Sequence, residues 1–378
     1  MIDLKKKINV CEPLITKNAK KYINDCIDTE WISSAGKYLE DFEKKWAEYC
    51  GADEGIAVTN GTSALQVAFK SLNLQPGDEV IMPSFTIISC VHQIIRAGAK
   101  PIFIDSDLET WNINVLDIEK NITKKTKALL IPHIYGLPVD MDFIEKICKK
   151  YNLLLIEDAA EMIGQTCGLS KCGSFGDLST FSFYANKHIT TGEGGMIVTN
   201  SEHLYERCRS LRNLCFQNQQ RFIHSEIGWN YRMTNIQAGL GLAQLERLDQ
   251  IIKRKREIGA KYHERLISLK KFINLPLKKT IFADNIYWVF GIVLKNTEIF
   301  NTSKELIEKL SENKIGSRPF FYPLHLQPIL LKNNANLKNI TLPNSENLYK
   351  KGLYLPSGLA LRDKQIEYVC DTLERIFL

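Results

Sequence analysis

Lys187 follows an apolar stretch and precedes a glycine-rich turn, in the sequence FSFYANKHITTGEGG at residues 181–195. A lysine in a loop beside apolar residues can lose the water around its ammonium group. Its pKa then falls, and the neutral amine becomes a nucleophile able to form a Schiff base. Most lysines of the chain must be ordinary solvated charges, so Lys187 needs support from elsewhere in the sequence.

A second candidate group lies at 60–65, where NGTSAL joins an expected strand to an expected helix. Gly61 allows a tight turn, and Thr62 and Ser63 offer hydroxyl and backbone N–H groups at the N-terminus of the helix. Such N–H groups, with the positive end of the helix dipole, bind phosphate. An ordinary helix cap would use the same residue types.

A third candidate group is IEDAAE at 156–161, in which Glu157 and Asp158 follow an apolar run of strand length. Successive side chains of a strand point to opposite faces, so one of these carboxylates can reach a ligand at the end of the sheet while the other cannot. A carboxylate buried there needs a cationic partner, and a protonated ring nitrogen would serve. A helix cap or a buried structural salt bridge explains this stretch equally well.

A phosphate-binding turn, a strand-end carboxylate and a loop lysine are together the parts that hold pyridoxal phosphate. The lysine would bond to the aldehyde carbon, the carboxylate would keep the pyridine nitrogen protonated, and the turn would anchor the phosphate. Each signal is weak alone, but all three indicate one cofactor. We therefore predict that the protein binds pyridoxal phosphate.

These groups must be positioned by the surrounding elements, and the middle of the chain alternates helical and strand patterns. The predicted strands are 55–60, 78–84, 100–107, 126–134, 152–160 and 178–183. The predicted helices are 38–50, 61–72, 87–98 and 141–151. This alternation indicates an α/β fold, with a mostly parallel sheet covered by helices on both faces and ligands at the carboxyl ends of its strands.

The pattern changes near residue 236. The elements predicted after this point are one long helix or two with a kink at 236–269, a strand at 287–294, and two further helices at 304–315 and 364–377. We interpret them as a smaller C-terminal α+β domain. The predicted division is a large cofactor-binding domain with an N-terminal arm at 1–245 and a small domain at 246–378.

Composition narrows the class of protein. With 378 residues the chain is too long for one small core. The net charge of +6 comes from lysines interspersed with glutamates, which favours a solvated surface over a nucleic-acid groove. The ten cysteines form no CxxC pair or zinc-spaced cluster, and no apolar run has the length of a membrane span. Since a signal peptide is also missing, we expect a cytoplasmic protein with free thiols that binds no metal, nucleic acid or membrane.

Longer stretches resemble the motifs of one enzyme family. They are TEWISSAGKYLEDFE (29–43), VTNGTSAL (58–65), AGAKPIFID (97–105), IPHIYGLPVDM (131–141), IEDAAE (156–161), GSFGDLSTFSFYANKHITTGEGGMIVTN (173–200), IGWNYRMTNIQAGLGLAQLE (227–246) and SRPFFYPLH (317–325). Over nearly its whole length the chain resembles DegT-like nucleotide-sugar aminotransferases, which belong to the fold-type-I class of pyridoxal-phosphate enzymes. Within that family it is most similar to members that transfer an amino group to C4 of a GDP-linked 4-keto-6-deoxy sugar.

The resemblance implies a reaction. Glutamate would donate the amino group, pyridoxamine phosphate would hold it, and the product would be a 4-amino-4,6-dideoxy sugar nucleotide for surface polysaccharide. The alternative is an aminotransferase for a dTDP- or UDP-linked keto sugar, acting at C4 or C3. A dehydratase of the family would carry histidine in place of Lys187. A regulatory relative would bind the cofactor without turnover, and the presence of Lys187, Asp158 and Ser182 argues against it.

The resemblance also implies roles for single residues. Lys187 matches the Schiff-base lysine, and Asp158 matches the partner of the pyridine nitrogen. Asn230 matches an asparagine that reaches the phosphate in the other subunit, which implies a homodimer with composite active sites. The matches to phosphate contacts are Gly61, Thr62, Ser63 and Ser182. The matches to segments near the nucleotide-sugar substrate are Ser33, Ser34, Arg318 and His325.

Two cofactor positions depart from the common family pattern. Glu161 stands where many members have histidine or glutamine, and it would lie near the phenolic oxygen of the cofactor. Relatives often stack an aromatic side chain on the pyridine ring at the position of Ile87. Strand alternation would put Phe85 on the same face as Ile87, so either residue can cover the ring, and we count Phe85 among the expected cofactor contacts.

Overall fold

The computed structural model describes residues 6–217, 221–295, 299–333 and 335–378. Its α-helices are α1 (Lys17–Asp28), α2 (Lys37–Cys50), α3 (Gly61–Ser71), α4 (Ile88–Arg96), α5 (Met141–Tyr151), α6 (Glu202–Arg212), α7 (Asn235–Leu245), α8 (Leu248–Leu266), α9 (Ser303–Glu312), α10 (Pro328–Asn333), α11 (Pro343–Lys351) and α12 (Asp363–Phe377). Its strands are β1 (Glu54–Val58), β2 (Glu79–Pro83), β3 (Lys100–Ile104), β4 (Thr126–Pro132), β5 (Leu154–Asp158), β6 (Thr166–Cys167), β7 (Ser170–Lys171), β8 (Leu178–Ser182), β9 (Gly195–Thr199), β10 (Ile273–Asn274), β11 (Phe290–Leu294), β12 (Arg318–Pro319) and β13 (Gly352–Leu355). Within the described residues, no helix combines the length and the hydropathy needed to cross a membrane.

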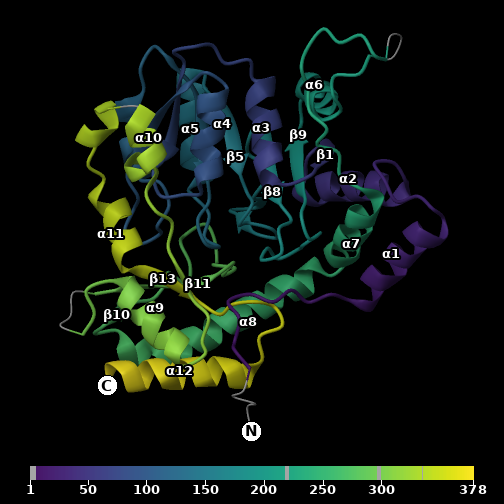
Figure 1. Cartoon of the computed structure of the whole chain (residues 1–378). Coiled ribbons are helices and arrows are strands. Elements are labelled where there is room, and N and C mark those ends of the chain that lie inside the picture. Colours follow the sequence, from purple (N-terminus) through teal and green to yellow (C-terminus); the bar gives the residue numbers. More distant parts are fainter. Residues whose placement is uncertain (1–5, 218–220, 296–298, 334) are drawn as a thin grey trace.

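A seven-stranded sheet with the order β1-β9-β8-β5-β4-β2-β3 forms the centre of the large domain. Neighbouring strands are parallel except in the two pairs that involve β9. Figure 1 shows this sheet with α3, α4 and α5 beside it and the small domain at its lower end. The predicted α/β fold with a mostly parallel sheet is therefore confirmed.

Helices bury both faces of the sheet. On β4, Leu129 and Ile131 belong to the hydrophobic cluster that includes residues of α2, α5 and α7. The alternate residues Ala128 and Leu130 belong to the cluster that includes residues of α3 and α4. Because both faces are covered, this strand is apolar at nearly every position instead of alternating apolar and polar residues.

The small domain is built on a four-stranded antiparallel sheet with the order β10-β11-β13-β12. Helices α8, α9 and α12 supply Tyr262, Leu306 and Leu373 to its core, where they join Phe290 of β11. Of the two alternatives predicted for residues 236–269, the structure has the second, two helices, α7 and α8, which are separated by residues 246 and 247.

Two segments cross the predicted domain division. Near the N-terminus, Ile8 joins the core of the small domain and pairs with Ile315 in a parallel bridge, and Figure 1 shows this end of the chain beside α8 and α12. In the other direction, Leu324 and Leu330 pack into the cluster formed by α3 and α4. A division near residue 246 therefore stays a prediction that fits the bulk of the two cores.

Candidate active site

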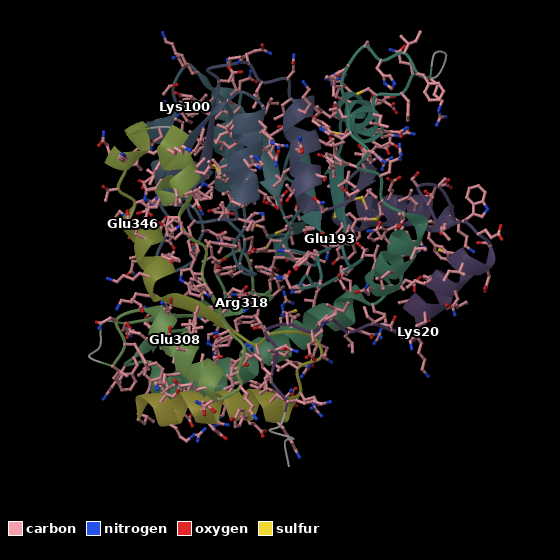
Figure 2. All side chains as sticks on the ribbon, in the orientation of Figure 1. Lys20, Lys100, Glu193, Glu308, Arg318 and Glu346 are labelled. Atoms are coloured by element: carbon pink, nitrogen blue, oxygen red, sulfur yellow. The ribbon has the colours of Figure 1, made fainter. Side chains whose placement is uncertain are left out.

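The parallel strands end at one edge of the large sheet, where a cavity of about 800 Å³ lies. The segments that follow β1, β5 and β8 meet there because carboxyl ends of parallel strands share an edge. The predicted site residues that line the cavity are Gly61, Thr62, Ser63, Asp158, Glu161, Ser182 and Lys187. Glu193, a further lining residue, is labelled near the centre of the molecule in Figure 2.

One end of the cavity is formed by the N-terminus of α3. The Asn60 side chain caps this helix by accepting the N–H of Ser63 at 2.8 Å. The first N–H groups of a helix have no partner within it, so those of Gly61 and Thr62 are available to an anion. A Cβ at Gly61 would lie 2.8 Å from Cβ of Ser182, so glycine is required for helix and strand to approach this closely.

Asp158 ends β5 and lies almost fully buried on the wall of the cavity. Its carboxylate accepts a hydrogen bond from the N–H of Ala160 at 3.1 Å and one from Sγ of Cys90 at 3.4 Å. Burial raises the pKa of this carboxyl group. Within the described residues Asp158 has no ion-pair partner, so a cationic ligand group would supply the charge that the site lacks.

Lys187 lies beside Glu161 and under Trp288. Its Nζ is 3.9 Å from Oε1 of Glu161 and 3.8 Å from the centroid of the Trp288 ring. Burial lowers the pKa of Lys187, and it raises the pKa of Glu161 to about 8. The second oxygen of Glu161 accepts the N–H of Tyr135 at 2.7 Å. The amine therefore lies in a desolvated pocket, as its sequence context predicted.

Alternation along the strand predicted that one of Glu157 and Asp158 would face away from the ligand, and Glu157 is the one that does not line the cavity. Its two oxygens accept from Nε2 of His133 and the Oγ of Ser179, both at 3.0 Å, and from the N–H groups of Gly173 and Phe175 at 2.6 and 3.0 Å. His133 in turn lines the cavity. Glu157 thus holds together the layer behind the site, while Asp158 faces the ligand space.

Phe85 lies outside the cavity, contrary to expectation. Its side chain is fully buried and packs against Tyr135, Phe320 and Phe321. Ile87, which is 44% exposed, lines the cavity instead. The alternation argument fails because β2 ends at Pro83 and the backbone bends over residues 84–86, before Ile87 caps the start of α4.

His325 also fails to reach the cavity. It is fully buried, with Nδ1 2.7 Å from the Oγ of Ser84 and Nε2 3.2 Å from Oε1 of Glu346. Both ring nitrogens are engaged, so the side chain has no atom left for a substrate in this conformation. Figure 2 shows Glu346 on α11, far from Glu193 in that view.

None of the remaining predicted substrate and partner residues is part of the wall of the cavity. Arg318 is exposed on β12 and pairs in register with Tyr354, which is a lining residue. Ser33 and Ser34 lie between α1 and α2, and the carbonyl of Ser33 accepts the N–H of Asn235. Asn230 is exposed at a bridge to Asn213. Their roles toward ligands stay predictions.

Several lining residues were not predicted. They are Asn60, Gln66, Thr86, Ser89, Arg96, Tyr184, Asn186, Glu193, Tyr231, Trp288, Phe321 and Tyr354, among others. Trp288 is the most consequential, because it covers Lys187 and its Nε1 donates to the carbonyl of Asn186 at 3.0 Å. Its sequence signal was only that of an aromatic residue near a strand of the small domain.

The fold and the site together define an aminotransferase. The chain belongs to the DegT/DnrJ/EryC1/StrS aminotransferase family, whose family model matches residues 13–374. It is 42% identical to the GDP-perosamine synthase of Escherichia coli O157:H7 over 372 residues, which covers 98% of this chain and 99% of that protein. It is 40% identical to the GDP-perosamine synthase of Vibrio cholerae over 371 residues, again covering 98% and 99%. Among solved structures, Helicobacter pylori PseC, an aminotransferase of pseudoaminic acid biosynthesis, has the same fold, with a TM-score of 0.91, 24% identity, and 98% and 99% of the two chains covered.

Proposed function

We propose that the protein is a pyridoxal-phosphate-dependent aminotransferase that moves an amino group from glutamate to C4 of a GDP-linked 4-keto-6-deoxy sugar. The product would be a 4-amino-4,6-dideoxy sugar nucleotide used for surface polysaccharide. The observation that carries the proposal is the convergence of a lysine with a side chain only 11% exposed, a buried carboxylate and the N-terminus of α3 in one cavity. The two GDP-perosamine synthases named above support the choice of substrate.

The donor set of the cavity fits this cofactor. The N-terminus of α3, with Gly61, Thr62 and Ser63, would hold the phosphate together with the hydroxyl of Ser182. Asp158, buried without a cation of its own among the described residues, would pair with a protonated ring nitrogen. When bound, pyridoxal phosphate supplies an electrophilic carbon, an electron-accepting ring and, in its pyridoxamine form, a place to hold the amino group.

The remaining chemistry falls to Lys187. Its desolvated Nζ would act as nucleophile in binding and, once released, as the base and acid that moves a proton to or from the reacting carbon. Glu161, 3.9 Å from this nitrogen, would hold a proton next to it. Trp288 would keep water away, because its ring covers the amine.

Replacement of Lys187 tests the assignment. After borohydride reduction, the wild-type chain should carry a pyridoxyl group on the peptide that contains Lys187, as detected by mass spectrometry. Lys187→Ala should lose this adduct, the yellow colour and turnover, while Lys124→Ala, at an exposed loop position, should keep all three. A Lys187→Ala protein that still transfers amino groups would refute the proposal.

The substrate and the assembly need separate experiments. We expect turnover of a GDP-linked 4-keto-6-deoxy sugar with glutamate, with amination at C4 read by NMR; a preference for the dTDP or UDP sugar, or for C3, would establish the alternative. The proposed homodimer has sites shared between subunits through Asn230. Mixing inactive Lys187→Ala and Asn230→Ala proteins should then restore activity, because each mixed dimer has one intact site. A mixture without activity would refute the shared site.

A further inference from the structure

Lys255 of α8 is a buried lysine close to the site. It is only 3% exposed and forms no ion pair with any residue that the structure describes. Burial lowers its pKa to about 8. An unpaired charge of this kind is costly to bury, so an apolar residue would be favoured here if packing were the only requirement.

The Nζ of Lys255 donates to two backbone carbonyl oxygens. One belongs to Trp288, at 2.9 Å, and the other to Ser357. A neutral amine keeps two N–H groups, so both hydrogen bonds persist when the lysine loses its proton. The lysine therefore connects α8 to the segment before β11 and to the loop that follows β13.

Trp288 needs such support because it lies outside the regular ladder of the sheet. β11 begins only at Phe290, and the preceding residue, Tyr287, has a φ of 50°. That left-handed conformation is rare for an aromatic residue and must be held by its surroundings. At the other end of the side chain, the Nε1 of Trp288 is fixed by the carbonyl of Asn186, next to Lys187.

We propose that Lys255 is a positioning residue of the active site, which holds the backbone of Trp288 so that the indole ring covers the Nζ of Lys187. The proposal deepens the proposed function, since it takes Lys187 as the reactive lysine. The chain of contacts is continuous, from Lys255 to the Trp288 carbonyl and from the indole ring to Lys187. Lys255 itself is not among the residues that line the cavity.

The test replaces Lys255 by methionine, which has a similar length and no donor. The readout is the rate at which a small amine-reactive reagent labels the Nζ of Lys187 in the cofactor-free full chain. The labelling is done at alkaline pH, where this amine is neutral in all variants, and its extent is measured by peptide mass spectrometry. We expect Lys255→Met to raise this labelling rate about tenfold. A tenfold rise corresponds to a loss of about 1.4 kcal/mol in the free energy that protects Lys187 from the reagent. Trp288→Leu should raise it at least as much.

Tyr262→Phe is the matched control. Tyr262 lies on the same helix, and its hydroxyl donates at 2.9 Å to the carbonyl of Pro356, the residue before Ser357. Its replacement also removes one buried hydrogen bond but leaves Trp288 in place, so stability should fall while the labelling of Lys187 stays at the wild-type rate. If Lys255→Met does not fold, Lys255→Leu, which also removes the donor to the carbonyl of Trp288, is used in the same assay, with the same rise in labelling expected.

The outcomes separate the two proposals. In the cofactor-loaded enzyme, Lys255→Met should lower kcat with little change in KM for the keto sugar. Lys255 variants that fold and label Lys187 at the wild-type rate would overturn the positioning role and leave the proposed function standing. Turnover by Lys187→Ala would instead overturn the proposed function, whatever the labelling rates.

Discussion

Gly61→Ala tests whether the junction of α3 and β8 sets the anion-binding end of the cavity. The new Cβ would lie 2.8 Å from Cβ and 3.2 Å from Oγ of Ser182, whereas ordinary contacts begin at 3.4 Å. Ser182 cannot turn away, because its Cβ is attached to the backbone of β8, a strand in the middle of the sheet. The helix terminus must therefore move away from the strand by several tenths of an ångström.

Two costs follow from this movement. Crowding in a packed interior should lower the free energy of unfolding by about 1–3 kcal/mol. A hydrogen bond to a charged group contributes about 1.5–3 kcal/mol, so one lost phosphate contact should weaken the binding of pyridoxal phosphate by about 10- to 100-fold. Lys187 and Asp158 remain in place, so the variant should still form its lysine adduct at saturating cofactor.

The assay combines urea unfolding of the cofactor-free chain with a spectroscopic titration of pyridoxal phosphate. Ser182→Gly removes the atoms that the new Cβ would meet. The double variant Gly61→Ala/Ser182→Gly should therefore unfold within about 0.5 kcal/mol of Ser182→Gly alone, which gives a coupling energy of at least about 0.5 kcal/mol. Gly239→Ala is the control, since a Cβ at this position in α7 would approach nothing closer than 3.3 Å.

Two results would refute this reasoning. If the costs of Gly61→Ala and Ser182→Gly simply add, the two residues do not compete for space. If Gly61→Ala and the control Gly239→Ala both bind the cofactor as tightly as the wild-type chain, the N-terminus of α3 is not the phosphate site.

Three further predictions concern residues behind the site. Glu157→Gln should lower the free energy of unfolding, measured in urea, by about 3–5 kcal/mol, because buried donors lose their acceptor. The control Glu145→Gln, on the exposed side of α5, should change it by less than about 0.5 kcal/mol. Equal effects of the two substitutions would contradict this prediction. Burial lowers the pKa of His188 from 6.5 to about 3, so the unfolded chain takes up a proton first and stability falls as the pH drops from 6.5 toward 3. In His188→Asn this fall should be shallower by about 1.4 kcal/mol per pH unit, and an unchanged slope in urea titrations would argue against a neutral His188. His325→Ala should lower the melting temperature and leave KM for the keto sugar unchanged, whereas a large rise in KM at wild-type stability would restore its predicted contact with substrate.

The fold and the centre of the site were accessible from the sequence because their signals are local. Apolar runs between amphipathic stretches predicted the strands, and the strand ends located the site. Lys187, Asp158 and the turn at Gly61 each follow such a run directly, so their meeting at one edge of the sheet follows from parallel topology. The family resemblance led to the same positions and was confirmed over residues 13–374.

The residues that the sequence missed, and the predicted residues that do not line the cavity, depend on packing between distant segments. Phe85 was expected to contact the cofactor because alternation was extended past Pro83, where the strand ends. His325 is withdrawn from the cavity by Ser84 and by Glu346 of α11, which no local pattern indicates. Trp288 reaches Lys187 from the small domain, across about a hundred residues of sequence whose packing decides the contact.

The two buried glutamates of the IEDAAE stretch show how such packing assigns chemistry. Both side chains are buried and lie four residues apart, so the sequence alone does not distinguish their tasks. Glu157 accepts four hydrogen bonds, which fills its capacity as a carboxylate. Glu161 accepts one backbone N–H and otherwise faces Lys187, and burial raises its pKa to about 8. The number of donors around each acid therefore makes Glu157 a structural support and leaves one oxygen of Glu161 facing the amine of Lys187.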